Sequence, residues 1–89
     1  MSSALNPHLL IFSVGSRYKL AKAIKAGFKL DLDVRCGEDV EYREHRYSRY
    51  DDCHVYYFKR LDSGEVFEYW VHRDTPISET YALFTRDEH

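Results

Sequence analysis

The sequence predicts an α+β fold in which one N-terminal amphipathic basic helix packs on a three- to four-stranded antiparallel β-sheet. Three observations predict it. Strong helix formers dominate the segment from Arg17 to Ala26. Apolar and polar residues alternate from Leu30 onward, and aromatic residues, which favour strands, make up 16% of the chain. A chain of 89 residues has room for one small core, so we expect residues 1–89 to form a single domain.

The two ends of the chain are expected to lie outside the core. Residues 1–7 are small and polar and end at Pro7, which predicts a loose leader, and residues 86–89 form a polar tail. The apolar run from His8 to Val14 predicts a short buried strand. A run this short reveals no period, however, so the start of a longer helix fits it equally well.

The predicted helix runs from Arg17 to Ala26. Ser16 is a suitable N-cap, and Gly27 follows where a left-handed C-terminal cap is expected. At 100° per residue, Leu20, Ala21 and Ile24 fall on one apolar face that would pack on the sheet. The basic residues of this part of the chain form a positive stripe outside that face: Arg17, Lys19, Lys22, Lys25 and Lys29.

The charge distribution makes this basic stripe a candidate binding surface. It contains five Lys or Arg and no acidic residue, whereas all 15 Asp and Glu lie from Asp31 onward, in a chain of net charge −2. Such an asymmetry is found on surfaces that bind phosphates or an acidic protein partner, but a solvated outward helix face is its commonest explanation.

Period-two alternation predicts the strands. Residues 30–34 alternate, Gly37–Asp39 form a turn, and residues 40–47 alternate again with many charges, as in an edge or solvent-facing strand. Tyr50–Asp52 form the next turn. Pro76 ends the last hairpin because it cannot donate to a ladder, and residues 77–84 are compatible with either a helix or a strand.

The hairpin around Asp62-Ser63-Gly64 is the strongest local signal. A type I turn that ends in a glycine with positive φ gives a three-residue loop, which places Leu61 opposite Glu65. This register predicts a core face with Val55, Tyr57, Phe67, Tyr69 and Val71. The opposite, outward face is then the predicted partner-binding site: His54, Tyr56, Phe58, Arg60, Trp70 and His72.

The sequence offers only weak candidates for a metal site or a catalytic site. The chain has five His and two Cys but no CxxC or HxxxH pair. Cys53 and His54 are also adjacent on a strand and would point to opposite faces. We therefore expect no metal and no cofactor. A small metal-independent ribonuclease, with His54 and His72 paired across the strands as acid and base, is one alternative function.

The outward aromatic face favours a binding function. Tyr, Trp and Arg dominate interface hot spots because they combine large buried area with polar tips. We therefore expect a non-enzymatic binding or regulatory protein that occupies a surface of a larger protein or ribonucleoprotein. Homodimerisation through the same sheet face is an alternative. Phage-encoded inhibitors of host machinery, such as anti-CRISPR proteins, are comparable in size, without any shared motif.

The runner-up function is DNA or RNA binding, with the basic stripe as a phosphate clamp. Against it, the helix lacks the Asn, Gln and clustered Arg that read base edges.

The sequence also predicts where the protein resides. The apolar run at residues 9–14 is too short for a signal peptide or for the roughly 20 residues of a membrane span. We therefore expect a cytoplasmic protein with no membrane contact, in which Cys36 and Cys53 are reduced thiols.

Overall fold

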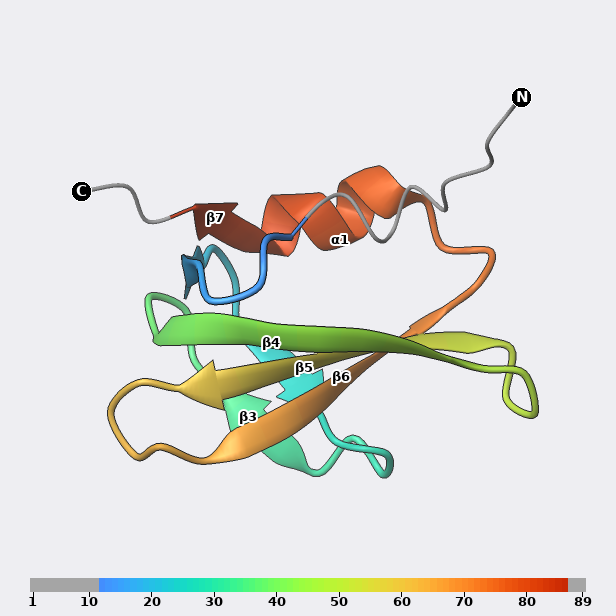
Figure 1. Ribbon diagram of the computed structural model, residues 1–89, viewed down its shortest axis with the longest axis horizontal. Helices are drawn as coiled ribbons and strands as arrows, with labels where there is room; N and C mark the ends of the chain where they lie inside the picture. Colours follow the sequence, from blue (N-terminus) through green and yellow to red (C-terminus); the bar gives the residue numbers. More distant parts are fainter. Residues whose placement is uncertain (1–11, 87–89) are drawn as a thin grey trace.

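The computed structural model describes residues 12–86, which form seven strands and one short helix (Figure 1). The elements are β1 (Arg17–Leu20), β2 (Ile24–Ala26), β3 (Leu32–Val34), β4 (Asp39–Ser48), β5 (Cys53–Arg60), β6 (Val66–His72), α1 (Ile77–Leu83) and β7 (Phe84–Arg86). The predicted leader at 1–7 and residues 87–89 of the predicted tail lie outside the described residues. Residues 12–14, the described end of the predicted strand at 8–14, are not in a strand.

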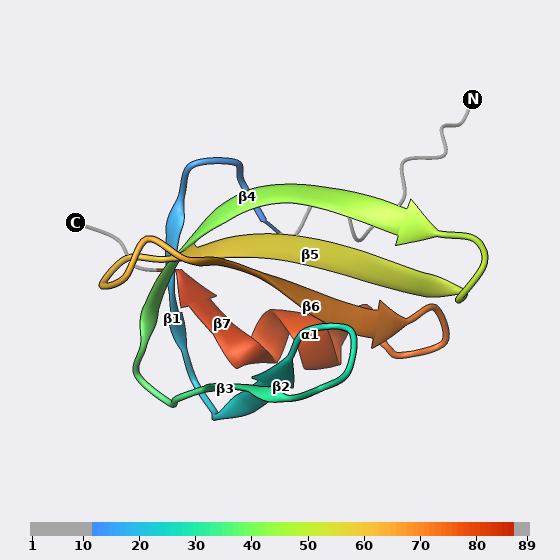
Figure 2. The same ribbon diagram turned by 90° about the horizontal axis from the view of Figure 1, so that it is seen from below.

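The strands form two antiparallel sheets. One has five strands in the order β6-β5-β4-β1-β7, and the other is the β2–β3 hairpin. In Figure 1, α1 and β7 form a layer over one side of β4, β5 and β6. Seen from below in Figure 2, the β2–β3 hairpin lies alongside β6. The amide of Gly27 joins the two sheets there by donating to the carbonyl of Glu68 at 2.6 Å.

The predicted N-terminal helix at 17–26 is wrong, and with it the α+β fold class. This segment forms β1 and β2, and the one described helix lies near the C-terminus. The buried residues of the segment are Tyr18, Leu20, Ile24 and Ala26, all at even positions. That is a period of two, which the composition of helix formers concealed.

Tertiary packing explains why strands form here. Helix propensities differ by less than about 1 kcal/mol per residue among ordinary residues, and an isolated ten-residue helix is marginal in water. Burial of Tyr18 and Leu20 contributes more, roughly 1.5–3 kcal/mol per large apolar side chain. β1 also forms backbone hydrogen bonds with a strand on each side, and Tyr18 lies opposite Val40 of β4 and Arg86 of β7.

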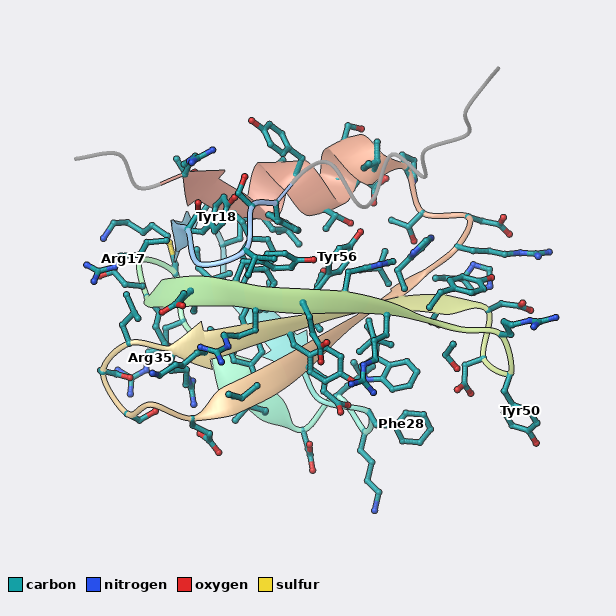
Figure 3. All side chains as sticks on the ribbon, viewed as in Figure 1. Arg17, Tyr18, Phe28, Arg35, Tyr50 and Tyr56 are labelled. Atoms are coloured by element: carbon teal, nitrogen blue, oxygen red, sulfur yellow. The ribbon has the colours of Figure 1, made fainter. Side chains whose placement is uncertain are left out.

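The core lies between the β4-β5-β6 sheet and the layer of α1 and β7, and it is largely aromatic. The ring of Phe12 is at its centre, 5.2 Å from Tyr18 and 5.3 Å from Tyr56 between centroids. Phe58 and Phe84 stack at 4.4 Å, which joins β5 to β7. Figure 3 shows Tyr18 and Tyr56 pointing into this space.

A bulge in β4 changes which of its residues point toward the core. The register with β5 shifts between Tyr42 and Glu44, so that Tyr42 faces Phe58 while His45 faces Tyr56. An extra residue on one strand reverses the alternation beyond it. Both Tyr42 and His45 therefore lie on the inner side, although their numbers differ by three.

The predicted register of the β5–β6 hairpin is off by one residue. The amide of Arg60 donates to the carbonyl of Glu65 at 2.7 Å, and that of Gly64 donates to the carbonyl of Arg60 at 2.8 Å. The loop therefore has four residues, 61–64, rather than three. Phe58 lies opposite Phe67 instead of Glu68. The predicted inner face of β6 is correct, but that of β5 is reversed.

The segment at 77–84 contains both of the structures that fit its sequence. Residues 77–83 form α1, and Phe84 begins β7, which pairs with β1. Phe84 is fully buried and holds this end of the chain against the core.

Candidate protein-binding face

The side of β4, β5 and β6 that points away from α1 is called the outer face below. The corrected register decides which side chains lie on it, because residues opposite each other in neighbouring strands share a face. The outer face carries Glu44 and Arg46 from β4, Val55, Tyr57 and Lys59 from β5, and Val66, Glu68, Trp70 and His72 from β6.

Trp70 is the largest side chain on the outer face, and it meets Phe28 from the β2–β3 turn. Their ring centroids are 4.9 Å apart at an interplanar angle of 63°. Phe28 nevertheless remains 63% exposed. The indole Nε1 of Trp70 donates to Glu68 at 3.0 Å, so its polar group is already satisfied. Figure 3 shows Phe28 on the opposite side of the sheet from Tyr56.

Val55, a neighbour of Trp70 in the strand register, is buried on the outer face. Val55 lies between Arg46 and Trp70 in the register of the three strands and is only 3% exposed. It does not belong to the main core cluster. The guanidinium of Arg46 lies over the ring of Tyr57, 5.7 Å from its centroid. Val55 is therefore nearly buried on the outer face, between the strands that carry Arg46 and Trp70.

The charges around this centre compensate one another. Arg46 pairs with Glu44 at 3.3 Å, and Arg43 pairs with Glu41 at 3.6 Å. Pairs this exposed contribute at most about 1 kcal/mol to stability, but they leave the surface without a dominant sign. A hollow of about 400 Å³ lies on this part of the molecule; its lining residues are Arg43, Glu44, Tyr57 and Val66.

The structure separates the residues predicted to form the partner-binding site. Trp70 and His72 lie on the outer face, as predicted. Tyr56 and Phe58 are fully buried in the core, so the prediction that they project outward is wrong. Burial raises the pKa of Tyr56 above its ordinary value, and that of Tyr42 to about 12. The phenols of both are therefore neutral packing groups.

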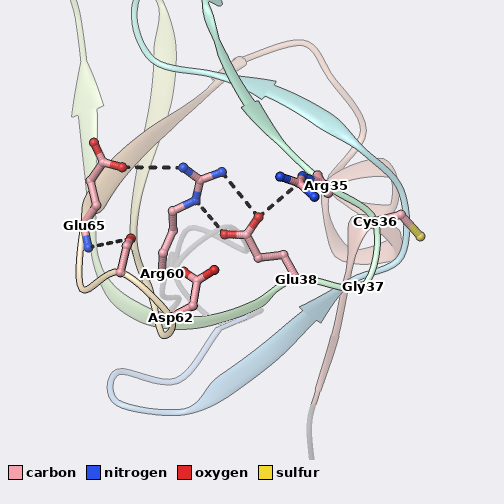
Figure 4. Close-up of a pocket in the computed structure, with 8 residues that line it drawn as sticks. Arg35, Cys36, Gly37, Glu38, Arg60, Asp62 and Glu65 are labelled. Atoms are coloured by element: carbon pink, nitrogen blue, oxygen red, sulfur yellow. Dashed lines mark hydrogen bonds and ion pairs between the residues drawn. The ribbon is translucent and has the colours of Figure 1, made fainter.

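Arg60, another predicted contact residue, is occupied inside the protein (Figure 4). Its Nε donates to Glu38 at 2.6 Å, and its Nη2 donates to the carbonyl of Asp33 at 2.7 Å. The hydrogen bond with Glu38 raises the pKa of Arg60, although partial burial opposes the shift. Arg60 thus ties the β5–β6 loop to the β3–β4 turn. The polar hollow beside it, about 430 Å³, is lined by Arg35, Cys36, Gly37, Glu38, Arg60, Asp62, Ser63 and Glu65.

The predicted pair of His54 and His72 does not form. His54 is 5% exposed on the inner side, whereas His72 is exposed and lies opposite Cys53. His54 instead meets His45, with Nδ1 of His54 2.8 Å from Nε2 of His45. Within residues 12–86, no three potential metal-binding side chains come together.

The five basic residues of the predicted stripe do not share one helix face. Arg17 and Lys19 lie on β1, and Lys25 lies on β2. Lys19 pairs with Asp39 at 2.9 Å, and Lys25 with Asp33 at 2.5 Å. Lys22 and Lys29 lie in the connections between strands. The concentrated positive surface expected from the sequence is therefore dispersed and partly neutralised.

No family model, curated protein or solved structure matches this chain. Within the described part of the chain, no helix has the length and apolar character needed to cross a membrane.

The sequence-based prediction did not include Phe28 and Arg46, and it placed Val55 and Tyr57 in the core. The predicted three-residue loop places Tyr57 in the core, whereas the four-residue loop places it on the outer face. Phe28 lies just after the segment predicted to be a helix and was not assigned to any site. The β2–β3 turn that carries it to Trp70 becomes visible only when residues 24–34 are seen as a hairpin.

Proposed function

We propose that this protein is a non-enzymatic binding protein that acts by occupying a surface of a larger macromolecular partner through its outer face. The observation that carries the proposal is the contact between Phe28 and Trp70, in which the Phe28 ring of the β2–β3 turn packs against Trp70 of β6 and stays exposed. Homodimerisation and a phage-type inhibitor role stay predictions.

The chemistry of the outer face supports a protein partner. Interface hot spots combine aromatic side chains and Arg at a desolvated centre with a polar rim that excludes water. Trp70 with Phe28 supplies such a centre, and Tyr57 beneath Arg46 extends it. The indole N–H is satisfied by Glu68, so covering Trp70 leaves no donor unpaired.

The two alternative functions lose their geometric support. A ribonuclease would need His54 and His72 within reach of one substrate, but they lie on opposite sides of the sheet. A helical phosphate clamp would need a helix at 17–26, and that segment is two strands.

Affinity capture from the native host tests the proposal. The wild-type protein should recover a partner that the Phe28→Ser and Trp70→Ala variants recover poorly. Tyr50→Ser is the matched control, because Tyr50 is 97% exposed on the β4–β5 turn. Circular dichroism checks that each variant is folded. Equal recovery of the same proteins by all four forms would contradict the proposal.

A further inference from the structure

The backbone of Leu30 adopts a left-handed conformation that disfavours leucine. Its φ is +57°, and the only other described non-glycine residue with positive φ is Asp52. Asp and Asn tolerate this region because their side chains can bond locally, whereas most residues lose roughly 1–2 kcal/mol there. Leu30 is therefore a locally unfavourable choice of residue.

The turn shows which residue would be expected instead. The amide of Leu30 donates to the carbonyl of Gly27 at 3.1 Å, closing a turn over residues 27–30 between β2 and β3. A residue with positive φ at the end of such a turn, where Leu30 lies, is usually glycine. The β5–β6 hairpin follows that rule with Gly64, at φ +78°.

Burial of the leucine side chain does not offset this strain. Leu30 is 56% exposed and is not part of the core cluster. Phe28, two residues earlier in the same turn, is 63% exposed and contacts Trp70. The turn thus presents two large apolar side chains to solvent beside the centre of the outer face. Strain that the fold does not use is typical of functional contacts.

The charges around the turn indicate the kind of partner. Lys29 and Asp31 flank Leu30 with opposite signs, and Lys25 and Asp33 form an ion pair at the base of the hairpin. A protruding apolar tip without net charge suits an apolar pocket on a protein better than a phosphate backbone or an anionic lipid surface.

We propose that the turn at 27–30 is the anchoring contact of the outer face, and that it inserts Leu30 beside Phe28 into an apolar pocket of a partner protein. This inference rests on the proposed function and adds the position and chemistry of the decisive contact. The cost in fold stability at Leu30 is retained because the exposed side chain serves binding.

The first arm of the test needs no partner. Leu30→Gly and Leu30→Asn place residues that accept a positive φ, so both should raise the denaturation midpoint of the isolated protein. A midpoint lowered by both substitutions would mean that the leucine side chain supports the fold, and the inference would fall.

The second arm measures affinity for the partner protein recovered by the wild-type chain and then purified. Leu30→Asn should weaken binding by about tenfold or more, as expected for a hot spot. Val14→Asn is the matched control, because Val14 is an exposed apolar residue in the turn at 13–16. It should bind like the wild type.

The outcomes separate this inference from the proposed function. If Trp70→Ala weakens binding and Leu30→Asn does not, the outer face is the binding site and the turn is not its anchor. If neither variant changes the affinity, or no partner is recovered that depends on Trp70, both ideas fall. Vesicles of phosphatidylcholine and phosphatidylserine should not sediment with the protein. Sedimentation that Leu30→Asn abolishes would overturn the inference in favour of a lipid surface.

Discussion

Phe28 of the β2–β3 turn and Trp70 of β6 meet edge to face, with ring centroids 4.9 Å apart. The contact lies next to the hydrogen bond from Gly27 to Glu68. The β2–β3 turn is thereby held against β6, and an aromatic surface continues from one sheet to the other. Everything proposed about binding depends on this junction.

Replacing Phe28 with Ser should change the environment of Trp70 with little loss of stability. An edge-to-face pair contributes about 0.5–1.5 kcal/mol beyond area burial, and Phe28 is largely exposed. Trp70 is the chain's single tryptophan, so its emission reports on this site alone. We expect a red shift of the emission maximum in Phe28→Ser and none in Tyr50→Ser. An unchanged spectrum in both would mean that the two rings do not pack in solution.

Breaking the ion pair of Arg60 and Glu38 from one side should destabilise the fold strongly. Both side chains are mostly buried, and Arg60→Met leaves the Glu38 carboxylate without its positively charged partner. Losing one member of such a pair costs about 3 kcal/mol or more, whereas replacing both is better tolerated. Urea denaturation should therefore rank Arg60→Met as less stable than the double variant with Glu38→Gln. The reverse order would show that the pair does not connect the two loops as described.

Stability should fall at alkaline pH. Burial raises the pKa of Tyr42 from 10.0 to about 12, and burial also raises the pKa of Tyr69. A group whose folded pKa lies above its unfolded value stabilises the fold fully below the unfolded value. That contribution is lost as pH rises through the folded one. The free energy of unfolding should therefore decrease between pH 10 and about 12. Tyr42→Phe should lessen this decrease, and an identical pH profile in the variant would contradict the assignment.

The two cysteines should differ in reactivity. Cys36 is exposed, whereas Cys53 is partly buried opposite His72. Burial raises the pKa of the Cys53 thiol, and the charges of Asp51 and Asp52 add to the shift. A chromogenic disulfide reagent at neutral pH should modify one thiol rapidly and the second slowly. In Cys36→Ser only the slow phase should remain; a rapid phase in that variant would contradict the burial of Cys53.

The sequence predicted the strands after residue 30 better than those before it. The alternation over 30–34 and 40–47 corresponds to β3 and β4. Charged residues separate the apolar ones in both segments, so the pattern has the period of a strand and not that of a helix. In the segment at 17–26 two readings competed. Ala and Lys favour a helix, while Tyr18, Leu20, Ile24 and Ala26 follow a period of two. Burial of these four side chains in the tertiary structure favours the strands, and this burial cannot be inferred from the local composition.

The candidate site was half predicted for a similar reason. The outward orientation of Trp70 on β6 was correct, but Tyr56 and Phe58 were placed on the wrong side of β5. A single additional loop residue, with the amide of Arg60 paired to Glu65, reverses every assignment on one strand. Turn type can be anticipated from Gly64, but loop length depends on the hydrogen bonds around it.

A partner protein should cover both the outer face and the turn at 27–30. The most direct measurement is an NMR titration of the nitrogen-labelled protein with the purified partner. We expect the largest shifts at the indole N–H of Trp70 and at the amides of 27–30. Shifts confined to α1 and β7, with the signals of Trp70 and the turn unmoved, would show that the partner binds elsewhere on the protein.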